Sequence, residues 1–321
     1  MTPPILVFGS YMHDLSFSMR DFPKPGQTII GDFKSGPGGK GSNQAVAAAR
    51  TSVHTAFVGA TGEDAFADLA KNFHQEEGVH SKWARREDLA TGTAAIFVND
   101  KGENEIVVAL GANNSLSSND IPEEFLSAAD IMVTQLECNL DATEQALKKG
   151  KAHGITTLLN PAPMRDDFQA SILEWVDILV PNETEFVHMV QLRVPESHAS
   201  FSEESIPALE ETDLHDLCRQ FGVPTFIITL GSQGCFVSTQ DRYFTVPAIT
   251  DINVLDTTGA GDAFVGGFAS GLIQFGGDLE KAAQYGNLVA GLSVTRFGTA
   301  PSMPKESEIQ SEMSRRDLLL K

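Results

Sequence analysis

The segment Asp256–Asp262 reads Asp-Thr-Thr-Gly-Ala-Gly-Asp and leads into a stretch with helical spacing. Its glycines would let the amides of Gly259, Ala260 and Gly261 point inward at the helix N-terminus and form an anion hole, which the helix dipole strengthens. Asp262 would then begin the helix beside this hole. A carboxylate there can accept a proton from an attacking hydroxyl while the amides hold a transferred phosphoryl group. The alternative is that Asp262 only caps the helix, but the glycines on both sides favour catalysis.

A second glycine cluster, Gly36–Asn43, reads Gly-Pro-Gly-Gly-Lys-Gly-Ser-Asn. It matches GxGxxG but does not directly follow the first apolar run, as a dinucleotide-binding turn would. It also departs from a P-loop, because Lys34 stands in place of the first glycine and Gly41 in place of Ser or Thr. A tight backbone, a cation at Lys40 and an amide at Asn43 still predict close approach to a polar ligand.

Polar residues also follow five of the apolar runs. The set consists of Ser10 and Asp14, Gln135 and Glu137, Asn160, Asn182 and Glu185, and Thr229 and Gly231. In open parallel sheets, ligands bind outside the carboxyl ends of the strands. One such residue is usually a turn former or a helix cap, whereas the whole set favours a site for a polyol and Mg²⁺.

The elements that would position these residues alternate along the chain. Short apolar runs occupy Ile5–Phe8, Ile131–Thr134, Thr156–Leu159, Ile178–Val180 and Phe226–Leu230, and helical spacing occupies segments such as Ser42–Arg50, Ala142–Lys151 and Leu214–Phe221. This alternation predicts an α/β, Rossmann-like fold with a mostly parallel central sheet and helices on both faces.

Two segments with looser alternation, about 14–35 and 92–113, predict a small separate, antiparallel sheet inserted as a lid over the site. Residues 1–321 are expected to form a single domain into which this lid is inserted. The acidic stretch 191–213, which contains Pro195 and Pro207, is predicted to be a solvated loop.

Composition excludes several classes of protein. The chain has 321 residues and a formal net charge of −20, without the basic patch expected of a nucleic-acid binder. No run approaches the roughly 18 apolar residues of a membrane span, and the N-terminus lacks the pattern of a signal peptide. Cys138, Cys218 and Cys235 are scattered, so neither a disulfide framework nor a metal motif is predicted and a cytoplasmic location is expected.

The chain resembles the phosphofructokinase-B-type (ribokinase-like) family of carbohydrate kinases nearly from end to end. Gly38–Arg50 (GGKGSNQAVAAAR) is similar to the first family signature and Asp256–Phe268 (DTTGAGDAFVGGF) to the second. Between them lie FVNDKGENEI, LGAN, NPAP, PNETE and ITLGSQG, and the closing SVTRFGTAPSMP of Ser293–Pro304 also matches. The resemblance implies a Rossmann-like core of about nine strands with a β-sheet lid, clasped between two subunits of a homodimer.

The resemblance also implies roles for individual residues. Asp262 would be the base that deprotonates the sugar hydroxyl, and the amides of Gly259, Ala260 and Gly261 would form the anion hole. The substrate-binding positions would be Asp14, Gly38, Gly39, Lys40, Asn43 and Glu137. The ATP-binding positions would be Asn182, Thr229, Gly231 and Asn287, with Glu185 holding Mg²⁺ through water. The positions of a K⁺ site would be Asp256, Thr258, Ser293, Arg296, Gly298 and Ser302.

One position departs from the family pattern. Where the pattern has an Asn two residues before Asp14, this chain has Met12, which cannot make that hydrogen bond. We expect a kinase that transfers phosphate from ATP to the 5-hydroxyl of D-ribose, with a 2-deoxyribose kinase on the same scaffold as the first alternative. A sugar or nucleotide sensor without catalysis is a second alternative, which the intact Asp262 and its glycine-rich neighbours argue against.

Overall fold

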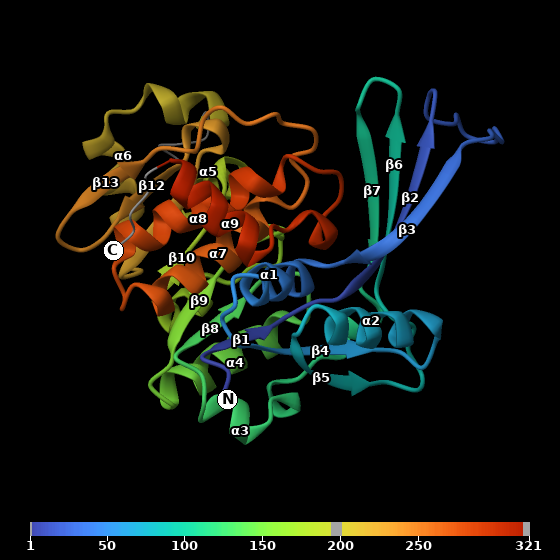
Figure 1. Ribbon diagram of the computed structural model, residues 1–321, viewed down its shortest axis with the longest axis horizontal. Coiled ribbons are helices and arrows are strands. Elements are labelled where there is room, and N and C mark those ends of the chain that lie inside the picture. The colour runs from blue at the N-terminus through green and yellow to red at the C-terminus, as the bar shows by residue number, and fades with distance from the viewer. Residues whose placement is uncertain (1, 194–200, 317–321) are drawn as a thin grey trace.

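A nine-stranded sheet runs through the middle of the molecule in the computed structural model, which describes residues 2–193 and 201–316 (Figure 1). Its strand order is β13-β12-β11-β10-β9-β8-β1-β4-β5. The strands are β1 (Ile5–Phe8), β4 (Thr55–Thr61), β5 (His80–Arg85), β8 (Ile131–Thr134), β9 (Thr156–Leu159), β10 (Ile178–Leu179), β11 (Thr225–Thr229), β12 (Cys235–Ser238) and β13 (Tyr243–Val246). The seven neighbouring strands β11, β10, β9, β8, β1, β4 and β5 pair in parallel. At one edge, β12 and β13 are added in antiparallel orientation.

The central strands form where the sequence has continuous apolar runs. Every residue of Ile5–Phe8 and Ile131–Thr134 is buried, and the two strands pair so that Val7 lies opposite Val133. Strands buried on both faces have no reason to alternate apolar and polar residues, which is why these runs are continuous. The predicted α/β fold with a mostly parallel sheet is confirmed.

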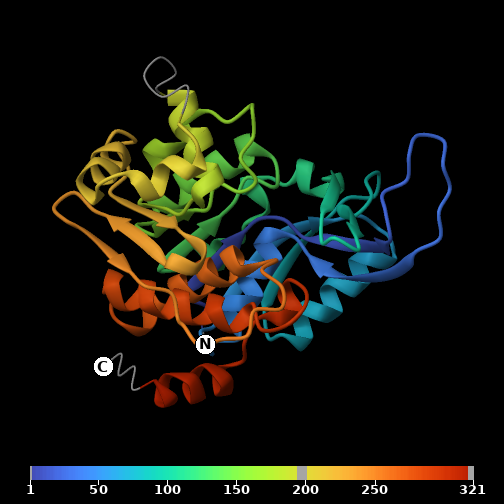
Figure 2. The same cartoon turned by 90° about the horizontal axis from the view of Figure 1, so that it is seen from above.

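Helices cover both faces of this sheet (Figures 1 and 2). On one face lie α1 (Lys40–Ala49), α2 (Ala65–Glu76), α7 (Ala260–Gln274), α8 (Leu279–Ser293) and, outermost, α9 (Glu306–Arg315). On the other lie α3 (Glu123–Leu126), α4 (Leu140–Ala152), α5 (Glu183–Arg193) and α6 (Glu211–Arg219). Short 3₁₀ helices are η1 (Gly111–Ser115), η2 (Ser118–Asp120), η3 (Ala170–Trp175), η4 (Glu203–Ala208), η5 (Gly231–Gln233) and η6 (Ala300–Ser302).

Glycines allow α7 to approach its neighbours closely. A Cβ at Gly266 would lie 2.5 Å from the carbonyl oxygen of Gln44 in α1, and one at Gly267 would lie 2.8 Å from the side chain of Val289 in α8. Helix α7 is therefore fixed between α1 and α8, and its N-terminus, which carries Asp262, is held firmly against the beginning of α1.

A second sheet projects from the main body (Figure 1). Its order is β3-β2-β6-β7, with β2 (Met12–Met19), β3 (Asp32–Gly38), β6 (Thr93–Asn99) and β7 (Asn104–Ala109). The predicted antiparallel pairing holds for β2 with β3 and for β6 with β7, but β2 and β6 pair in parallel. The reason is that β2 follows β1 and β6 follows β5, and these two parallel strands leave the central sheet in the same direction.

The acidic stretch 191–213 is not the wholly solvated loop that its composition predicts. Residues 191–193 still belong to α5, 194–200 lie outside the described residues, and η4 and α6 occupy most of the remainder. Phe201 and Ile206 are buried in the core that α5 and α6 share, so apolar residues among the acidic ones anchor this part of the chain. Of the helices described, none has the length and apolar character needed to cross a bilayer.

Candidate active site

The order of the central sheet reverses next to β1, because the chain goes from β1 to β4 and β5 on one side and then returns to β8 on the other. Ligands of open α/β folds bind at such switch points, outside the carboxyl ends of the strands. A cavity of about 210 Å³ lies at this edge of the sheet. It is lined by Lys40, Asn160, Ala162, Val180, Asn182, Glu185, Thr229, Thr257, Gly259, Ala260, Gly261, Asp262 and Val265.

Asp262 is the buried carboxylate of this cavity, with 6% of its surface exposed. Its Oδ2 accepts a hydrogen bond from Asn43 Nδ2 at 2.9 Å, and its Oδ1 accepts one from Gln44 Nε2 at 2.9 Å. Helix α7 starts at Ala260, and its N-cap is Gly259 at φ 79°. Asp262 is thus the third residue of the helix, not its first, and its side chain does not cap the helix. The capping alternative is therefore wrong.

The helix start brings the predicted anion-hole residues to the same cavity. Backbone N–H groups of a first helical turn lack partners within the helix, so they are available to an anion. The amide of Ala260 is an exception, because it donates to the carbonyl oxygen of Thr257 at 3.2 Å. An anion bound here would have to replace that contact to use all three amides.

Lys40 stands among three acidic side chains. Burial lowers the pKa of Lys40, but the nearby carboxylates of Asp262, Glu137 and Glu185 outweigh it, and the pKa is raised overall. Glu137 accepts hydrogen bonds from Ser10 Oγ at 2.5 Å and from the Lys40 amide at 2.9 Å. Burial nevertheless raises the pKa of both Glu137 and Glu185, against the lowering effect of Lys40.

Asp14 lies on β2 of the small sheet, close to the glycines of β3. Burial, and then repulsion from Glu137 and Asp262, raise its pKa to about 7. A Cβ at Gly38 would lie 2.2 Å from Asp14 Oδ2, so only glycine leaves room for this carboxylate. Gly39 has φ 88°, and a Cβ there would lie 2.5 Å from the backbone nitrogen of Met12. The tight backbone predicted for this segment is confirmed.

Asn182 and Glu185 form a reciprocal pair at the beginning of α5. The Asn182 amide donates to Glu185 Oε2 at 2.9 Å, and the Glu185 amide donates to Asn182 Oδ1 at 2.8 Å. This arrangement is a capping box, so part of the role of each side chain is structural. Both residues also line the cavity, together with Thr229 at the end of β11.

Two predicted nucleotide positions do not line the cavity. Gly231 is exposed beyond β11, at φ 51°. Asn287 is buried in α8, where its Nδ2 donates to the carbonyl oxygens of Val246 and Pro247 at 3.0 and 3.1 Å. Asn287 therefore holds the chain that follows β13.

The predicted K⁺ positions lie on the loop before α7 and on the segment from Ser293, at the end of α8, to Ser302, at the end of η6; Asp256 ties the two together. Asp256 Oδ1 accepts from the amide and hydroxyl of Thr258, and its Oδ2 accepts from the amide of Gly298. Burial raises the pKa of Asp256, but these hydrogen bonds outweigh it and lower the pKa overall. The other side chains have local partners: Ser293 donates to the Ala290 carbonyl, Ser302 to the Thr299 carbonyl, and Arg296 pairs with Glu308. Within residues 2–193 and 201–316, no three His, Cys, Asp or Glu side chains cluster as a metal site.

Sequence reasoning assigned no role to Gln44 or Asn113, and it named Asn160 only as one of the polar residues that follow the apolar runs. Gln44 contacts Asp262 directly, and Asn160 accepts from Gln44 at 3.0 Å. Asn113 holds the segment before Asp14, because it accepts from the Tyr11 amide at 3.1 Å and donates to the Tyr11 carbonyl at 2.8 Å. A usable signal was the long polar Gln44 in a run of otherwise small, buried residues, Ser42–Ala48.

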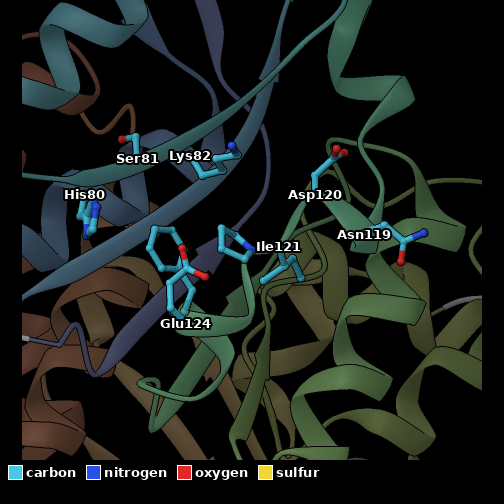
Figure 3. A pocket seen from close by; sticks show the side chains of 9 residues that line it. His80, Ser81, Lys82, Asn119, Asp120, Ile121 and Glu124 are labelled. Atoms are coloured by element: carbon cyan, nitrogen blue, oxygen red, sulfur yellow. The ribbon is translucent and has the colours of Figure 1, made fainter.

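A second hollow lies at the β5 edge of the central sheet (Figure 3). It measures about 400 Å³ and is lined by His80, Ser81, Lys82, Asn119, Asp120, Ile121, Pro122, Glu124 and Phe125. Asp120 is already paired with Arg86 at 2.7 Å, and His80 lies edge-on to the ring of Phe125. None of the predicted site residues lines this hollow.

Comparison with known proteins gives consistent matches over almost the whole chain. The model of the pfkB family of carbohydrate kinases matches residues 3–306. A deoxyribokinase of Salmonella typhi is 36% identical over 97% of this chain and 98% of its own length. A ribokinase of Staphylococcus aureus (strain COL) is 33% identical over 96% of this chain and 99% of its own.

Solved structures agree with these matches. The ribokinase of Giardia lamblia superposes with a TM-score of 0.88 at 31% identity, covering 98% of this chain and 100% of the other. An Arabidopsis thaliana ribokinase complexed with ribose and ATP superposes with a TM-score of 0.83 at 29% identity, covering 97% and 98%.

Proposed function

This chain belongs to the pfkB family of carbohydrate kinases, and within that family we propose that it transfers the γ-phosphoryl group of ATP to the 5-hydroxyl of D-ribose. The observation that carries the proposal is the environment of Asp262. Its carboxylate is buried beside the backbone amides at the N-terminus of α7, and both of its oxygens accept hydrogen bonds from side-chain amides. Each oxygen keeps a lone pair for a substrate proton.

In this mechanism Asp262 takes the proton of the 5-hydroxyl as that oxygen bonds to the γ-phosphorus, while the bond from the γ-phosphorus to the β,γ-bridging oxygen breaks and ADP leaves. The amides of Gly259 and Gly261 stabilise the charge on the transferred group, and Ala260 joins them once its contact with Thr257 is released. Lys40, which the site keeps protonated, lies among the carboxylates and offsets the phosphate charge in an otherwise acidic pocket.

Sugar hydroxyls would be bound by Asp14, Asn43 and Glu137, with the backbone of Gly38 and Gly39 close by. The orphaned Oδ1 of Asn43 supports this assignment, because it is buried and has no hydrogen-bond partner. A buried acceptor without a partner is costly, and a substrate hydroxyl would satisfy it.

ATP would lie along Asn182, Thr229 and the chain held by Asn287. The hard oxygen donors of Glu185 and its neighbours suit a Mg²⁺ ion that arrives with ATP and is held through water. Bound Mg²⁺ would neutralise phosphate charge. We also propose K⁺ activation through the loops of Asp256 and Gly298, a lid role for the small sheet, a homodimer formed through that sheet, and a cytoplasmic location.

The second candidate is a 2-deoxyribose kinase. It is favoured by the 36% identity to a deoxyribokinase and by Met12, which offers an apolar surface where an Asn would offer a hydrogen bond. Asp14 is still present, and one carboxylate can accept from two neighbouring hydroxyls, so ribose stays the first candidate. A sensor without catalysis would have no need of the base.

An ATP-coupled assay over a panel of sugars separates the three candidates. We expect ribose to have the highest kcat/KM and the product to be ribose 5-phosphate. Asp262→Asn should keep ATP and sugar binding, measured by calorimetry, and lose about 10²–10⁴-fold in kcat. Turnover of the variant within a few-fold of the parent contradicts the base assignment, and a preference for 2-deoxyribose replaces the first candidate by the second.

A further inference from the structure

A network of hydrogen-bonded side-chain amides connects Asp262 with residues that directly follow the strands β8 and β9. Gln135 Nε2 donates to Gln44 Oε1 at 2.7 Å, and Gln44 Nε2 donates both to Asp262 Oδ1 at 2.9 Å and to Asn160 Oδ1 at 3.0 Å. Asn160 Nδ2 donates in turn to the backbone carbonyl of Val180 at 2.8 Å. Gln44 and Gln135 are fully buried, and Asn160 is 7% exposed.

The backbone carbonyl of Val180 can only accept a hydrogen bond, and this fixes the orientation of every side-chain amide in the network. Asn160 must present its NH₂ group to this carbonyl and its oxygen to Gln44. Gln44 must then present its NH₂ group toward Asn160 and Asp262, and its oxygen toward Gln135. No amide can be turned over without placing two acceptors or two donors against each other.

The orientation is kept although it leaves one polar atom unsatisfied. Gln135 Oε1 is buried without a hydrogen-bond partner, and the space it occupies exists because residue 9 is glycine. A Cβ at Gly9 would lie 1.9 Å from this oxygen. Burying an unpaired oxygen costs free energy, so the arrangement is more readily explained by what it does for Gln44 than by stability.

We propose that Gln44 is a positioning residue for the base, oriented by Gln135 and Asn160. The inference rests on the proposed function of Asp262. Gln44 donates to Oδ1 while Asn43 donates to Oδ2, so the carboxylate cannot rotate and its remaining lone pairs keep one direction. A donor on the carboxylate also favours its ionised form, which is the form that accepts a proton.

The test compares the pH dependence of kcat in the parent, Gln44→Met and Gln44→Glu. Met keeps the length of the side chain but donates nothing, and Glu places a second carboxylate beside Asp262. We expect kcat to fall about 10–100-fold in Gln44→Met, with little change in the KM for sugar, because one hydrogen bond to a charged group is lost. The acid limb of the profile should move up by about one pH unit. Gln44→Glu should move it further in the same direction.

Gln135→Met tests whether the orientation passes through Gln44. We expect a smaller shift of the acid limb in the same direction, and no additional effect when Gln135→Met is combined with Gln44→Met. The matched control is Ser270→Ala, which removes a buried hydroxyl that links α7 to the Ala48 carbonyl of α1 without contact to Asp262. It should keep the parent's kcat and pH profile.

The inference is overturned if the acid limb of Gln44→Met coincides with that of the parent, or if the two substitutions act additively. If Gln44→Met does not fold, an unshifted acid limb in Gln135→Met overturns it equally. The profiles are recorded with whichever sugar of the panel the parent phosphorylates best. A failure of ribose as substrate then refutes the proposed function without deciding the role of Gln44.

Discussion

At the residue scale, acidic side chains are crowded around Lys40, and the clearest consequence is the raised pKa of Asp14. Asp14 shares the site with Glu137 and Asp262, and burial together with their repulsion raises its pKa to about 7. Its value as a hydroxyl acceptor therefore depends on pH within the physiological range. Its neighbour Lys40 stays charged throughout that range, whereas burial also raises the pKa of Glu137, so the variant Asp14→Asn is what assigns a change in sugar binding near neutrality to Asp14.

We predict that the KM for sugar rises as the pH falls from 8 to 6, while the KM for ATP changes little. Below a pKa of about 7 Asp14 takes up a proton and loses acceptor capacity, so sugar affinity should fall by up to about tenfold per pH unit. Steady-state kinetics of the parent and of Asp14→Asn check this, because the variant should bind sugar weakly at every pH. A sugar KM that is flat from pH 6 to 8 in the parent contradicts the assignment.

As the pH falls, sugar binding should weaken, whereas the stability of the folded protein should increase. A carboxyl group whose pKa is raised in the folded state stabilises the fold below its unfolded pKa and loses that contribution as the pH rises through about 7. Asp14→Asn should therefore raise the Tm of the ligand-free protein at pH 8 by a few degrees, since each kcal/mol corresponds to about 1.5 °C for 321 residues at ~2.1 cal/mol/K per residue. The gain should shrink toward pH 4. An equal Tm difference at both pH values would show that charge is not its cause.

Met12 is the residue that distinguishes the two pentoses in our proposal. It is fully buried, two residues before Asp14 on the same face of β2, and its sulfur lies 3.5 Å from Asn113 Nδ2. A sugar hydroxyl buried against Met without a partner costs about 1–3 kcal/mol, or roughly 5–150-fold in kcat/KM. Met12→Asn should raise the ratio of kcat/KM for ribose over 2-deoxyribose within that range. If both sugars change by the same factor, Met12 does not read the 2-position.

At the scale of elements, two loops meet behind the proposed anion hole. Asp256 joins the loop before α7 to the loop before η6 through the amide of Gly298, and a Cβ at Gly259 would lie 3.2 Å from Thr299. A cation that bound the backbone carbonyls of these loops would order the amides of Gly259–Gly261. The same contacts could instead be purely structural, with no cation needed.

Activity in K⁺, Na⁺ and a bulky organic cation decides between these possibilities. We expect kcat to be several-fold higher with K⁺, and Asp256→Asn to remove that advantage because a negatively charged oxygen ligand is lost. Ser314→Ala is the matched control, since its hydroxyl donates only to the Gln310 carbonyl within α9. Equal rates in all three cations, with Asp256→Asn equally slow in each, would show that Asp256 only ties the loops together.

The elements differ in how far the sequence predicts them. Ile5–Phe8 and Ile131–Thr134 are continuous apolar runs, so their local composition is sufficient. Strand β4 reads TAFVGAT and was not among the predicted strands, because small residues and a glycine interrupt its apolar run. It is nevertheless an interior strand, between β1 and the edge strand β5, and all seven of its residues are buried.

The residues of the candidate site also differ in how far the sequence predicts them. Asp262 and its glycines form one local motif, which the sequence displays directly. The role of Gln44 depends on Gln135 and Asp262, which are 91 and 218 residues away along the chain. Hydrogen bonds between residues so distant are set by how helix α1 packs on the sheet, and no local pattern encodes them.

At the scale of the whole molecule, the two faces of the small sheet differ in character. Pairing of the strands places Asp14 on the face toward the sugar site, with Ile96 and Ile106. The opposite face carries Phe17, Phe33 and Phe97 in one row, with ring centroids 5.0 and 5.6 Å apart, and Val107 lies on the same face of the edge strand.

The exposed part of this second face is largely apolar, which favours a covering partner. Phe33 is 55% exposed and Val107 64%, and all six residues of β7 are exposed. A long apolar edge strand is a site of unwanted pairing unless another chain covers it. A second copy of the same sheet would supply a matching aromatic row, and two copies related by a two-fold axis would close the assembly.

We therefore predict that Phe33→Glu and Val107→Glu convert a dimer into a monomer, as measured by light scattering at several protein concentrations. Both place a charge where the aromatic rows would meet, at a cost of several-fold to several hundred-fold in dimer affinity. Leu192→Glu is the matched control, because Leu192 is 49% exposed on α5, which packs on η4 and β11 of the main body, and should leave the dimer intact. Since the sheet also carries Asp14, loss of the partner should loosen β2 and raise the KM for sugar more than the KM for ATP. A parent that is monomeric at all concentrations, with an unchanged sugar KM in both variants, would mean that the small sheet works without a partner.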